Sequence, residues 1–322
     1  WHGNHYPLVK KLVCILFLSF SFGLFGQQLT SYTQYTLNRF ALNPALAGVK
    51  PCAETTFGNR RQWVGLENAP NVVFASFNTR LHHEDKYPKN FHGVGARVIV
   101  DRQGFSQNTI LKLAYAYHIR LWVNYHLSVG MFVGVQRHSF SYNSVRLSNN
   151  AIDPAINQEV ESDEVYPEIS PGGFLYNKNF FVGLSMLQAY PARTGELGTK
   201  ENRLSANYFL SAGYRFRGRN RLDFIPSFMF AFAPFVSPTM DLTLTADYKQ
   251  ILLAAVGSKY LNSAHVSVQV KLMRKVYLGY AYEYALNEIN TVAPSSHEII
   301  LNFTSCTTDK KEGSKFFCPA YQ

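Results

Sequence analysis

Hydrophobic and polar residues alternate along most of this chain. Every second residue from Leu127 to Val135 is apolar, and the residues between them are small, polar or aromatic. The split is sharper from Ala264 to Lys271, where alanine and valine alternate with histidine, serine, glutamine and lysine. Successive side chains point to opposite faces of a β-strand. The pattern therefore predicts strands that have one apolar face and one small or polar face.

We predict fourteen strands of this kind and no long helix in the body of the chain. Many are as long as the roughly 9–11 residues that a tilted strand needs to cross a bilayer, whereas strands of soluble domains are typically about 5–6 residues. The pattern favours an all-β fold, a transmembrane antiparallel β-barrel of about 14 strands, over a soluble sandwich. The predicted strands are 54–61, 72–80, 92–102, 109–120, 126–140, 169–177, 179–187, 203–217, 220–232, 237–248, 250–260, 264–272, 275–285 and 296–304.

The lengths of the predicted connections agree with a barrel. Long connections follow odd-numbered strands, and short turns follow even-numbered ones. Bacterial barrels sort their connections in this way, with short periplasmic turns and longer extracellular loops. We therefore expect the long loops outside and both chain ends in the periplasm, with 81–91 as the exception. The long loops are 142–167, 188–202 and 286–295, and the short turns are 177–178, 218–219, 249–250 and 273–275.

The first residues resemble a secretory signal peptide. Lys10 and Lys11 precede the apolar run 12–25, and Gly26 follows it. A basic start, a short apolar core and a small residue at the break are typical of such signals, and the run is short for a membrane-spanning helix. We predict a signal peptide at 1–26, an N-terminal periplasmic arm at 27–53, a barrel at 54–304 and a polar tail at 305–322. Export would place the mature chain in the outer membrane of a Gram-negative cell.

The cysteines allow at most one disulfide after cleavage. Removal of the signal peptide takes Cys14 away and leaves Cys52, Cys306 and Cys318. Cys306 and Cys318 in the tail are the plausible pair. The chain has no C-x-x-C motif, so zinc and thioredoxin-type chemistry have no support.

The amino-acid composition also argues against three other classes of protein. Only 16% of residues are charged and 15% are aromatic, against about 25% charged in ordinary soluble domains. A chain with so many aromatic side chains has too much apolar surface to remain disordered. A mean hydropathy of −0.12 and a single apolar run also argue against a helical protein with several membrane spans.

The net charge of +10 is spread over turns and over positions that we expect to face the lumen. No basic run of the kind that binds nucleic acid occurs. Anionic lipid headgroups or an acidic partner are simpler counterparts for this charge. The basic residues expected in the lumen are Arg97, Arg137, Arg215 and Lys271.

Candidate sites for catalysis and metal binding are weak. The run 82–85, with His92 nearby, is better explained as a solvated turn than as a metal site. The acidic cluster of Glu159, Glu161, Asp163 and Glu164 lacks the spacing of a calcium loop. None of the common nucleophile, zinc or nucleotide motifs occurs. We therefore predict no catalytic, metal or cofactor residues and no enzymatic activity.

Two short motifs near the mature start restrict the backbone. Proline fixes φ at Pro44 and keeps Asn43 extended, and Gly48 permits a conformation that other residues resist. The segment is either a rigid turn that leads into the first strand or a docking element for a periplasmic partner. Further on, Arg60, Arg61 and Trp63 are expected to form an aromatic anchor with basic neighbours at the membrane rim.

These motifs together resemble the PorP/SprF family of Bacteroidetes. The first is Gln34-Tyr35 followed by Asn43-Pro44-Ala45-Leu46-Ala47-Gly48, and the second is Asn59–Gly65 with Ala69-Pro70. The similarity runs from about Ser31 to Phe303. It departs from the family at Phe40-Ala41-Leu42 and in the cysteine-containing tail. The later motifs, in family order, are Gly93-Val94-Gly95, Asp101–Gly104, Tyr115–His118 and Ser296–Ile299.

The resemblance implies an outer-membrane barrel of the type IX secretion and gliding-motility apparatus. Its implied partners are outer-membrane lipids, periplasmic proteins of that apparatus and a secreted adhesin-like client with a C-terminal sorting domain. The alternative function is a passive channel or a transporter of hydrophobic solutes. The candidate partner-binding residues are Gln34, Tyr35, Asn43, Pro44, Ala45 and Gly48.

Overall fold

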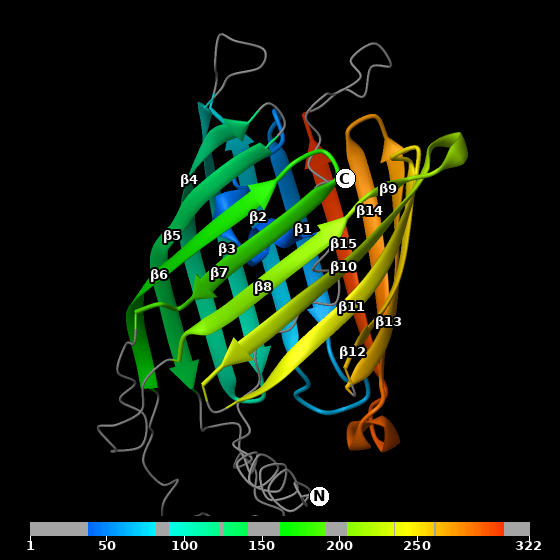
Figure 1. Ribbon diagram of the computed structural model, residues 1–322. Coiled ribbons are helices and arrows are strands. Elements are labelled where there is room, and N and C mark those ends of the chain that lie inside the picture. The colour runs from blue at the N-terminus through cyan, green and yellow to red at the C-terminus, as the bar shows by residue number, and fades with distance from the viewer. Residues whose placement is uncertain are drawn as a thin grey trace, which may run out of the picture.

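The strands of the chain pair into one antiparallel sheet that closes on itself as a barrel in this computed structural model (Figure 1). The structure describes residues 38–81, 90–122, 125–140, 162–190, 205–234, 236–260 and 262–305. Several segments named in the sequence analysis lie outside the described residues. They are the expected signal peptide, Gln34 and Tyr35, the run 82–85, Glu159 and Glu161, and the tail after 305.

Neighbours in sequence are neighbours in the sheet, and β15 pairs with β1 to close it. The strands are β1 Glu54–Arg61, β2 Asn71–Arg80, β3 Asn90–Gln103, β4 Ser106–Trp122, β5 Tyr125–Phe140, β6 Ser162–Tyr176, β7 Phe180–Leu187, β8 Asn207–Tyr214, β9 Phe216–Arg217, β10 Leu222–Ala233, β11 Val236–Tyr248, β12 Leu252–Lys259, β13 Ser263–Met273, β14 Val276–Ala285 and β15 Ser295–Thr304. The short 3₁₀ helices are η1 Arg39–Ala41, η2 Pro44–Leu46, η5 Arg219–Arg221 and η6 Glu288–Thr291.

The prediction of fourteen barrel strands is confirmed. β8 and β9 are two parts of one strand, because both pair with β10. The interruption lies on the side of β10, where pairing ends at Gly213 with Ser227 and resumes at Phe216 with Phe224. On the side of β7, the Arg215 amide still donates to the Asn179 carbonyl opposite it.

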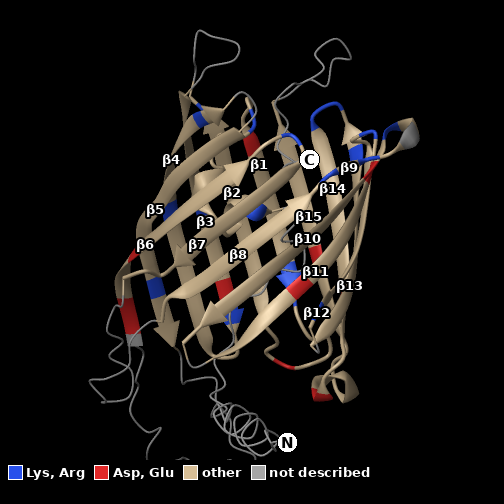
Figure 2. Ribbon diagram, in the orientation of Figure 1, with Lys and Arg blue, Asp and Glu red and all other residues tan. Residues whose placement is uncertain are grey.

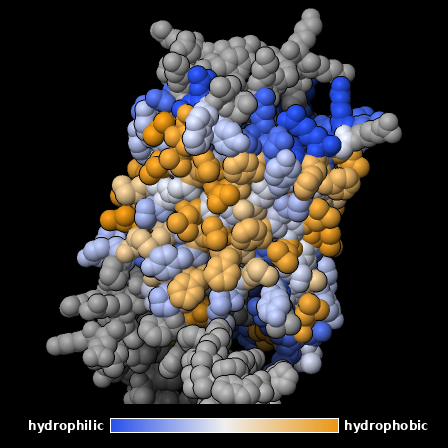
Figure 3. Space-filling model, viewed as in Figure 1, coloured by the Kyte–Doolittle hydropathy of each residue, from blue (hydrophilic) through white to orange (hydrophobic). Residues whose placement is uncertain are grey.

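The alternation of the sequence becomes the two faces of the barrel wall. On β5, Val129, Met131 and Val133 are exposed on the outside, whereas Ser128 and Phe132 are completely buried inside. Figure 3 shows apolar side chains gathered on the middle of the face that it draws. Exposed apolar side chains occur on the other strands as well, among them Leu113 on β4, Leu242 on β11 and Val266 on β13. A membrane barrel needs a hydrophobic belt of such side chains, because its outer face meets hydrocarbon rather than water. Within the described part of the chain, no helix is long and apolar enough to cross a membrane.

The two open ends of the barrel differ in their connections. At one end, here named the turn edge, β1 begins and β15 ends, and the turns 177–179, 218–221, 249–251 and 274–275 join the strands. At the other, the loop edge, lie the connections 62–70, 141–161, 188–206 and 286–294. Lys and Arg gather at the turn edge (Figure 2). As predicted, the long connections 141–161, 188–206 and 286–294 lie at one edge of the barrel and the short turns 177–179, 218–221, 249–251 and 274–275 lie at the other.

The strand expected at 169–177 begins earlier, at Ser162, and pairs with β5 as far as Phe140. Pro167 and Pro171 obscured this extension in the sequence, because proline cannot donate to a ladder. Both prolines precede Gly172, where the pairing of β6 with β7 begins, so this stretch of β6 is paired with β5 alone. The predicted loop 142–167 is shorter for the same reason.

Two side chains differ from the expected arrangement. Cys52 is disulfide-bonded, although the sequence favoured a Cys306–Cys318 pair, and its bonded partner lies outside the described residues. Arg137 was expected in the lumen but is exposed, and it forms an ion pair with Asp163 at 2.6 Å. The reason is its register, because Arg137 shares the outward parity of Val133 and Val135 on β5.

Candidate functional site: a plugged lumen

Residues 38–49, here named the plug, lie inside the barrel with every residue buried (Figure 1). Of its two short helices, η2 packs against the inner faces of β4, β5 and β6, and η1 packs against η2 and adds Phe40 to the same hydrophobic cluster. Phe40 contacts Phe132 with ring centroids 5.4 Å apart, and the Arg39 guanidinium lies 4.1 Å from the centre of the Phe181 ring. The chain therefore fills part of its own lumen.

The Asn43-Pro44 motif shapes and anchors the plug. The Asn43 side chain accepts a hydrogen bond from the Ala45 amide at 3.0 Å and so caps η2, while Pro44 occupies a first-turn position that needs no donor. The Asn43 amide group also donates to the carbonyls of Gly173 and Leu184, at 3.0 and 3.3 Å. One side chain thus starts the helix and ties it to two wall strands.

Wall side chains hydrogen-bond the plug through its backbone. Ser128 donates to the Ala45 carbonyl at 2.7 Å, and Ser185 donates to the Leu42 carbonyl at 2.6 Å. Arg97 donates to the Ala41 carbonyl. Buried carbonyls need such partners, because each unpaired one costs about 1–3 kcal/mol. The wall is therefore built to hold this segment inside.

The end of the plug is held in the same way. The Arg80 guanidinium donates to the carbonyls of Gly48 and Val49, at 3.1 and 2.7 Å. His118 Nε2 lies 2.8 Å from the Ala47 carbonyl and its Nδ1 lies 3.0 Å from the Tyr176 hydroxyl. A carbonyl can only accept, so Nε2 carries the proton and Nδ1 accepts from Tyr176.

Glycines in the wall make room for the plug. A Cβ on Gly93 would lie 2.0 Å from the Ala47 carbonyl oxygen, and one on Gly130 would lie 2.7 Å from the Ala45 nitrogen. On the plug side, Gly48 has a φ of +72°, a conformation that L-residues with side chains rarely adopt. The close approach therefore depends on the absence of a side chain on both surfaces.

The expected arm at 27–53 thus differs from the structure where the structure describes it. Residues 38–49 lie in the lumen, and Asn43, Pro44, Ala45 and Gly48 contact the wall. The physical reason is their composition, since small and apolar residues fit the narrow space between the wall strands. Gln34 and Tyr35 lie outside the described residues. Binding of a partner by any of the six residues stays a prediction.

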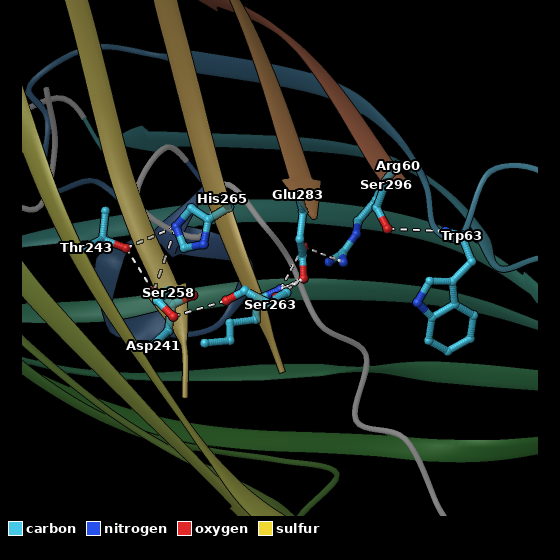
Figure 4. Close-up of polar contacts among 10 residues, drawn as sticks. Arg60, Trp63, Asp241, Thr243, Ser258, Ser263, His265, Glu283 and Ser296 are labelled. Carbon is cyan, nitrogen blue, oxygen red and sulfur yellow. Dashed lines mark hydrogen bonds and ion pairs between the residues drawn. The ribbon is translucent and has the colours of Figure 1, made fainter. Parts of the chain in front are cut away.

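A buried ionic network lies on the opposite wall (Figure 4). Glu283 accepts from Arg60 at 3.0 Å, from Lys259 at 2.9 Å and from Ser263 at 2.6 Å. All four side chains are buried, and they connect β1, β12, β13 and β14. The network therefore joins these strands by side-chain contacts inside the lumen, in addition to the backbone hydrogen bonds of the sheet.

Arg60 was expected at the membrane rim, and that expectation is wrong. Its side chain points into the lumen, because it shares the inward parity of the buried residues Thr56 and Glu54 on β1. Arg61 is exposed and Trp63 is half-buried, with the Trp63 amide donating to Ser296 at 3.2 Å. Sequence reasoning treated the three residues as one group, although adjacent residues face opposite ways.

Asp241, Thr243 and His265 lie together but do not form a catalytic triad. Thr243 donates to Asp241 at 2.8 Å, and His265 Nε2 lies 3.2 Å from Thr243 Oγ1 and 3.9 Å from Asp241 Oδ1. In a triad the acid orients the imidazole through the nitrogen opposite the nucleophile. Here hydroxyl and carboxylate both lie on the Nε2 side, and all three residues are buried.

No cluster of three or more metal-ligating side chains occurs among the described residues. His92, considered with the run 82–85, places its Nδ1 2.7 Å from the Tyr115 hydroxyl. Asp163, from the acidic cluster, holds Arg137. The residues that the sequence analysis missed are Arg80, Ser128 and Ser185, whose inward parity was their only signal. His118 was noted only as part of a family motif, without a role in the lumen.

Comparison with known proteins gives the family and the fold. The model of a family described as "Type IX secretion system membrane protein PorP/SprF" matches residues 24–303. No curated protein matches the chain in sequence. The toluene transporter TbuX of Ralstonia pickettii is similar in structure, with a TM-score of 0.52 and 11% identity over 82% of this chain and 92% of that chain. A TodX mutant, titled a monoaromatic hydrocarbon channel, has a TM-score of 0.45 and 10% identity over 79% and 88%.

Proposed function

The chain belongs to the PorP/SprF family of type IX secretion system membrane proteins, and from that premise we propose that it is a non-enzymatic, plugged barrel that supports secretion by binding other proteins. Its fold is that of outer-membrane barrels. The client that we propose is an adhesin-like protein with a C-terminal sorting domain, which the barrel helps to secrete or to anchor at the surface. Periplasmic proteins of the apparatus are the other proposed partners.

The plug carries this proposal. A diffusive channel needs an open path, but here twelve consecutive residues, 38–49, are buried in the lumen and are held by hydrogen bonds from several wall strands. The opposite wall adds buried ion pairs rather than solvated charges. Barrels of 16–18 strands leave an aqueous channel, while about 8 strands are filled by side chains. A plugged barrel of intermediate size suits a binding component better than a pore.

The alternative function is a channel or a transporter of hydrophobic solutes. The similarity to TbuX, a toluene transporter, favours it to the extent that the two share a barrel fold. At 11% identity the similarity supports a shared fold and does not support a shared substrate. A transporter would need the plug to move, and its cargo would have to displace contacts that the wall makes to the plug backbone.

We also propose that the loop edge faces the outside of the cell and the turn edge the periplasm, after cleavage of a signal peptide. Short turns on the periplasmic side are the rule in bacterial barrels. Cysteines placed at Ser148 and at Asn177 test the orientation in intact cells with a membrane-impermeant reagent. We expect labelling at 148 and protection at 177, and the reverse pattern would contradict it.

Partner binding by the N-terminal segment is tested by two variants. Deletion of residues 31–48 removes all of the plug except Val49, together with Gln34 and Tyr35. The double variant Gln34→Ala with Tyr35→Ala changes only residues that precede the plug. We expect both variants to lose secretion of the client while remaining heat-modifiable barrels, since β1 pairs with β2 and β15 independently of the plug. Normal secretion by both variants would overturn the docking proposal. Loss in the deletion alone would assign the requirement to the plug.

A further inference from the structure

Three neighbouring hairpins at the turn edge carry exposed cations on their turns. The hairpins are β9–β10, β11–β12 and β13–β14, and they are adjacent because β10 pairs with β11 and β12 with β13. Figure 2 shows basic residues along this part of the rim. We name the group the basic arc, and its members, all exposed, are Arg217, Arg221, Lys249, Arg274 and Lys275.

Two carboxylates that lie two residues from arc cations in the sequence, those of Asp223 and Asp247, are engaged inside the barrel. Asp223 and Asp247 lie 3.4 and 3.6 Å from the guanidinium of Arg215, which is itself buried. At the loop edge the situation is different, because the exposed Arg137 has an acidic partner in Asp163. The basic arc therefore presents positive charge to whatever lies beside the turn edge.

Apolar side chains lie between the cations of the arc. Ile251, Leu272 and Met273 are 48%, 55% and 70% exposed. Lys249 Nζ lies 4.7 Å from the centre of the Tyr248 ring, on the outer face of β11. Because the turns 249–251 and 274–275 are short, the cations stay next to the hydrophobic belt. Aromatic and basic residues at that level are typical of the zone of lipid headgroups.

Two cations of the arc, Arg221 and Lys249, have backbone φ angles that are positive. Lys249 and Gln250 have φ of 56° and 57°, and Asn220 and Arg221 have φ of 57° and 61°. Hairpin turns with this geometry favour Asn-Gly or Asp-Gly, because most L-residues are strained at positive φ. Lysine and arginine at such positions call for a reason other than turn formation.

We propose that the basic arc binds the phosphate groups of anionic phospholipids in the leaflet at the turn edge. Cations attract the phosphates, and the interleaved apolar side chains contact the acyl chains beneath them. An acidic protein would satisfy the charge but would leave Leu272 and Met273 without apolar surroundings. The short turns also keep the cations at the membrane surface. The proposal goes beyond the secretion function, and its test in vesicles does not depend on the orientation of the barrel, because both leaflets of a vesicle contain the same lipids.

The test measures which lipid lies beside the arc. A reporter protein carries one tryptophan, made by Tyr248→Trp together with Trp1→Phe, Trp63→Phe and Trp122→Phe. The full reporter chain is reconstituted in phosphatidylcholine vesicles that contain brominated phosphatidylglycerol or, separately, brominated phosphatidylcholine. Bromine quenches tryptophan fluorescence on contact, so the ratio of quenching gives the lipid preference at position 248. Heat modifiability verifies that each variant is folded.

We expect the reporter to prefer phosphatidylglycerol several-fold, because each cation near an anionic surface contributes to the attraction, and high salt should weaken this preference. Arg221→Gln, Lys249→Gln, Arg274→Gln and Lys275→Gln together should abolish it. The matched control neutralises three exposed cations of the loop edge, Arg61→Gln, Arg102→Gln and Arg137→Gln, and should keep it. Equal quenching by the two lipids in the reporter would overturn the proposal and favour an acidic protein as the partner. Equal loss in the control would also overturn it, because the effect would then not be local.

Discussion

At the residue scale, the plug depends on small side chains on both surfaces. Ala45 and Ala47 on the plug have no exposed surface. Gly130 and Gly93 on the barrel wall lie directly against them. Interiors packed at this density do not accept even one added methyl group without a shift. The sequence analysis found Asn43, Pro44 and Gly48 because their backbone preferences are local. It could not find the wall glycines as their counterparts, because that pairing joins residues that are distant in the chain.

A single methyl group on the wall tests this fit. In Gly130→Ala the new Cβ would lie 2.7–2.8 Å from backbone atoms of Pro44 and Ala45, so we expect the plug to loosen at a cost of about 1–3 kcal/mol. The control is Gly173→Ala on β6, where the nearest neighbour of a Cβ is the Ser128 carbonyl oxygen, 4.0 Å away. The measurement is the current through single barrels in planar bilayers. Openings in Gly130→Ala and none in Gly173→Ala are expected, and equal behaviour would refute a fitted plug.

At the element scale, most of the barrel could be predicted from the sequence. Alternation located the strands, because each one has a lipid face and a lumen face, and β1 spans the expected residues 54–61. The start of β6 was missed because prolines mask a strand that is paired on one side only. The split between β8 and β9 was missed because a gap in the pairing with β10 leaves no mark on the alternation of side chains.

The strands are also joined through the lumen, and Glu283 is the centre of that connection. Glu283→Gln would leave Arg60 and Lys259 buried without their carboxylate, and breaking a buried pair typically costs about 3–5 kcal/mol. We expect a clear fall in the denaturant midpoint of the barrel in detergent micelles. Asp163→Asn is the control, because its ion pair with Arg137 is exposed and exposed pairs contribute about 0–1 kcal/mol. Similar midpoints for the two variants would contradict the structural importance of the network.

At the scale of the whole molecule, a closed barrel holds a segment of its own chain and a set of buried ion pairs. The barrel and its parity followed from pattern and length, which are properties of single strands. The contents of the lumen did not, since they depend on which inward residues meet across the barrel. A lumen occupied by its own chain is what we expect of a binding component of a secretion system rather than of a diffusive channel.

Single-channel recording in planar bilayers tests that claim most directly. The purified mature chain should insert without a stable open current, because the plug and the ion pairs occupy its lumen. The variant lacking residues 31–48 should insert equally well and conduct steadily, because the wall pairing remains while the plug is gone. A large, stable conductance of the intact chain would contradict the account and favour a transporter.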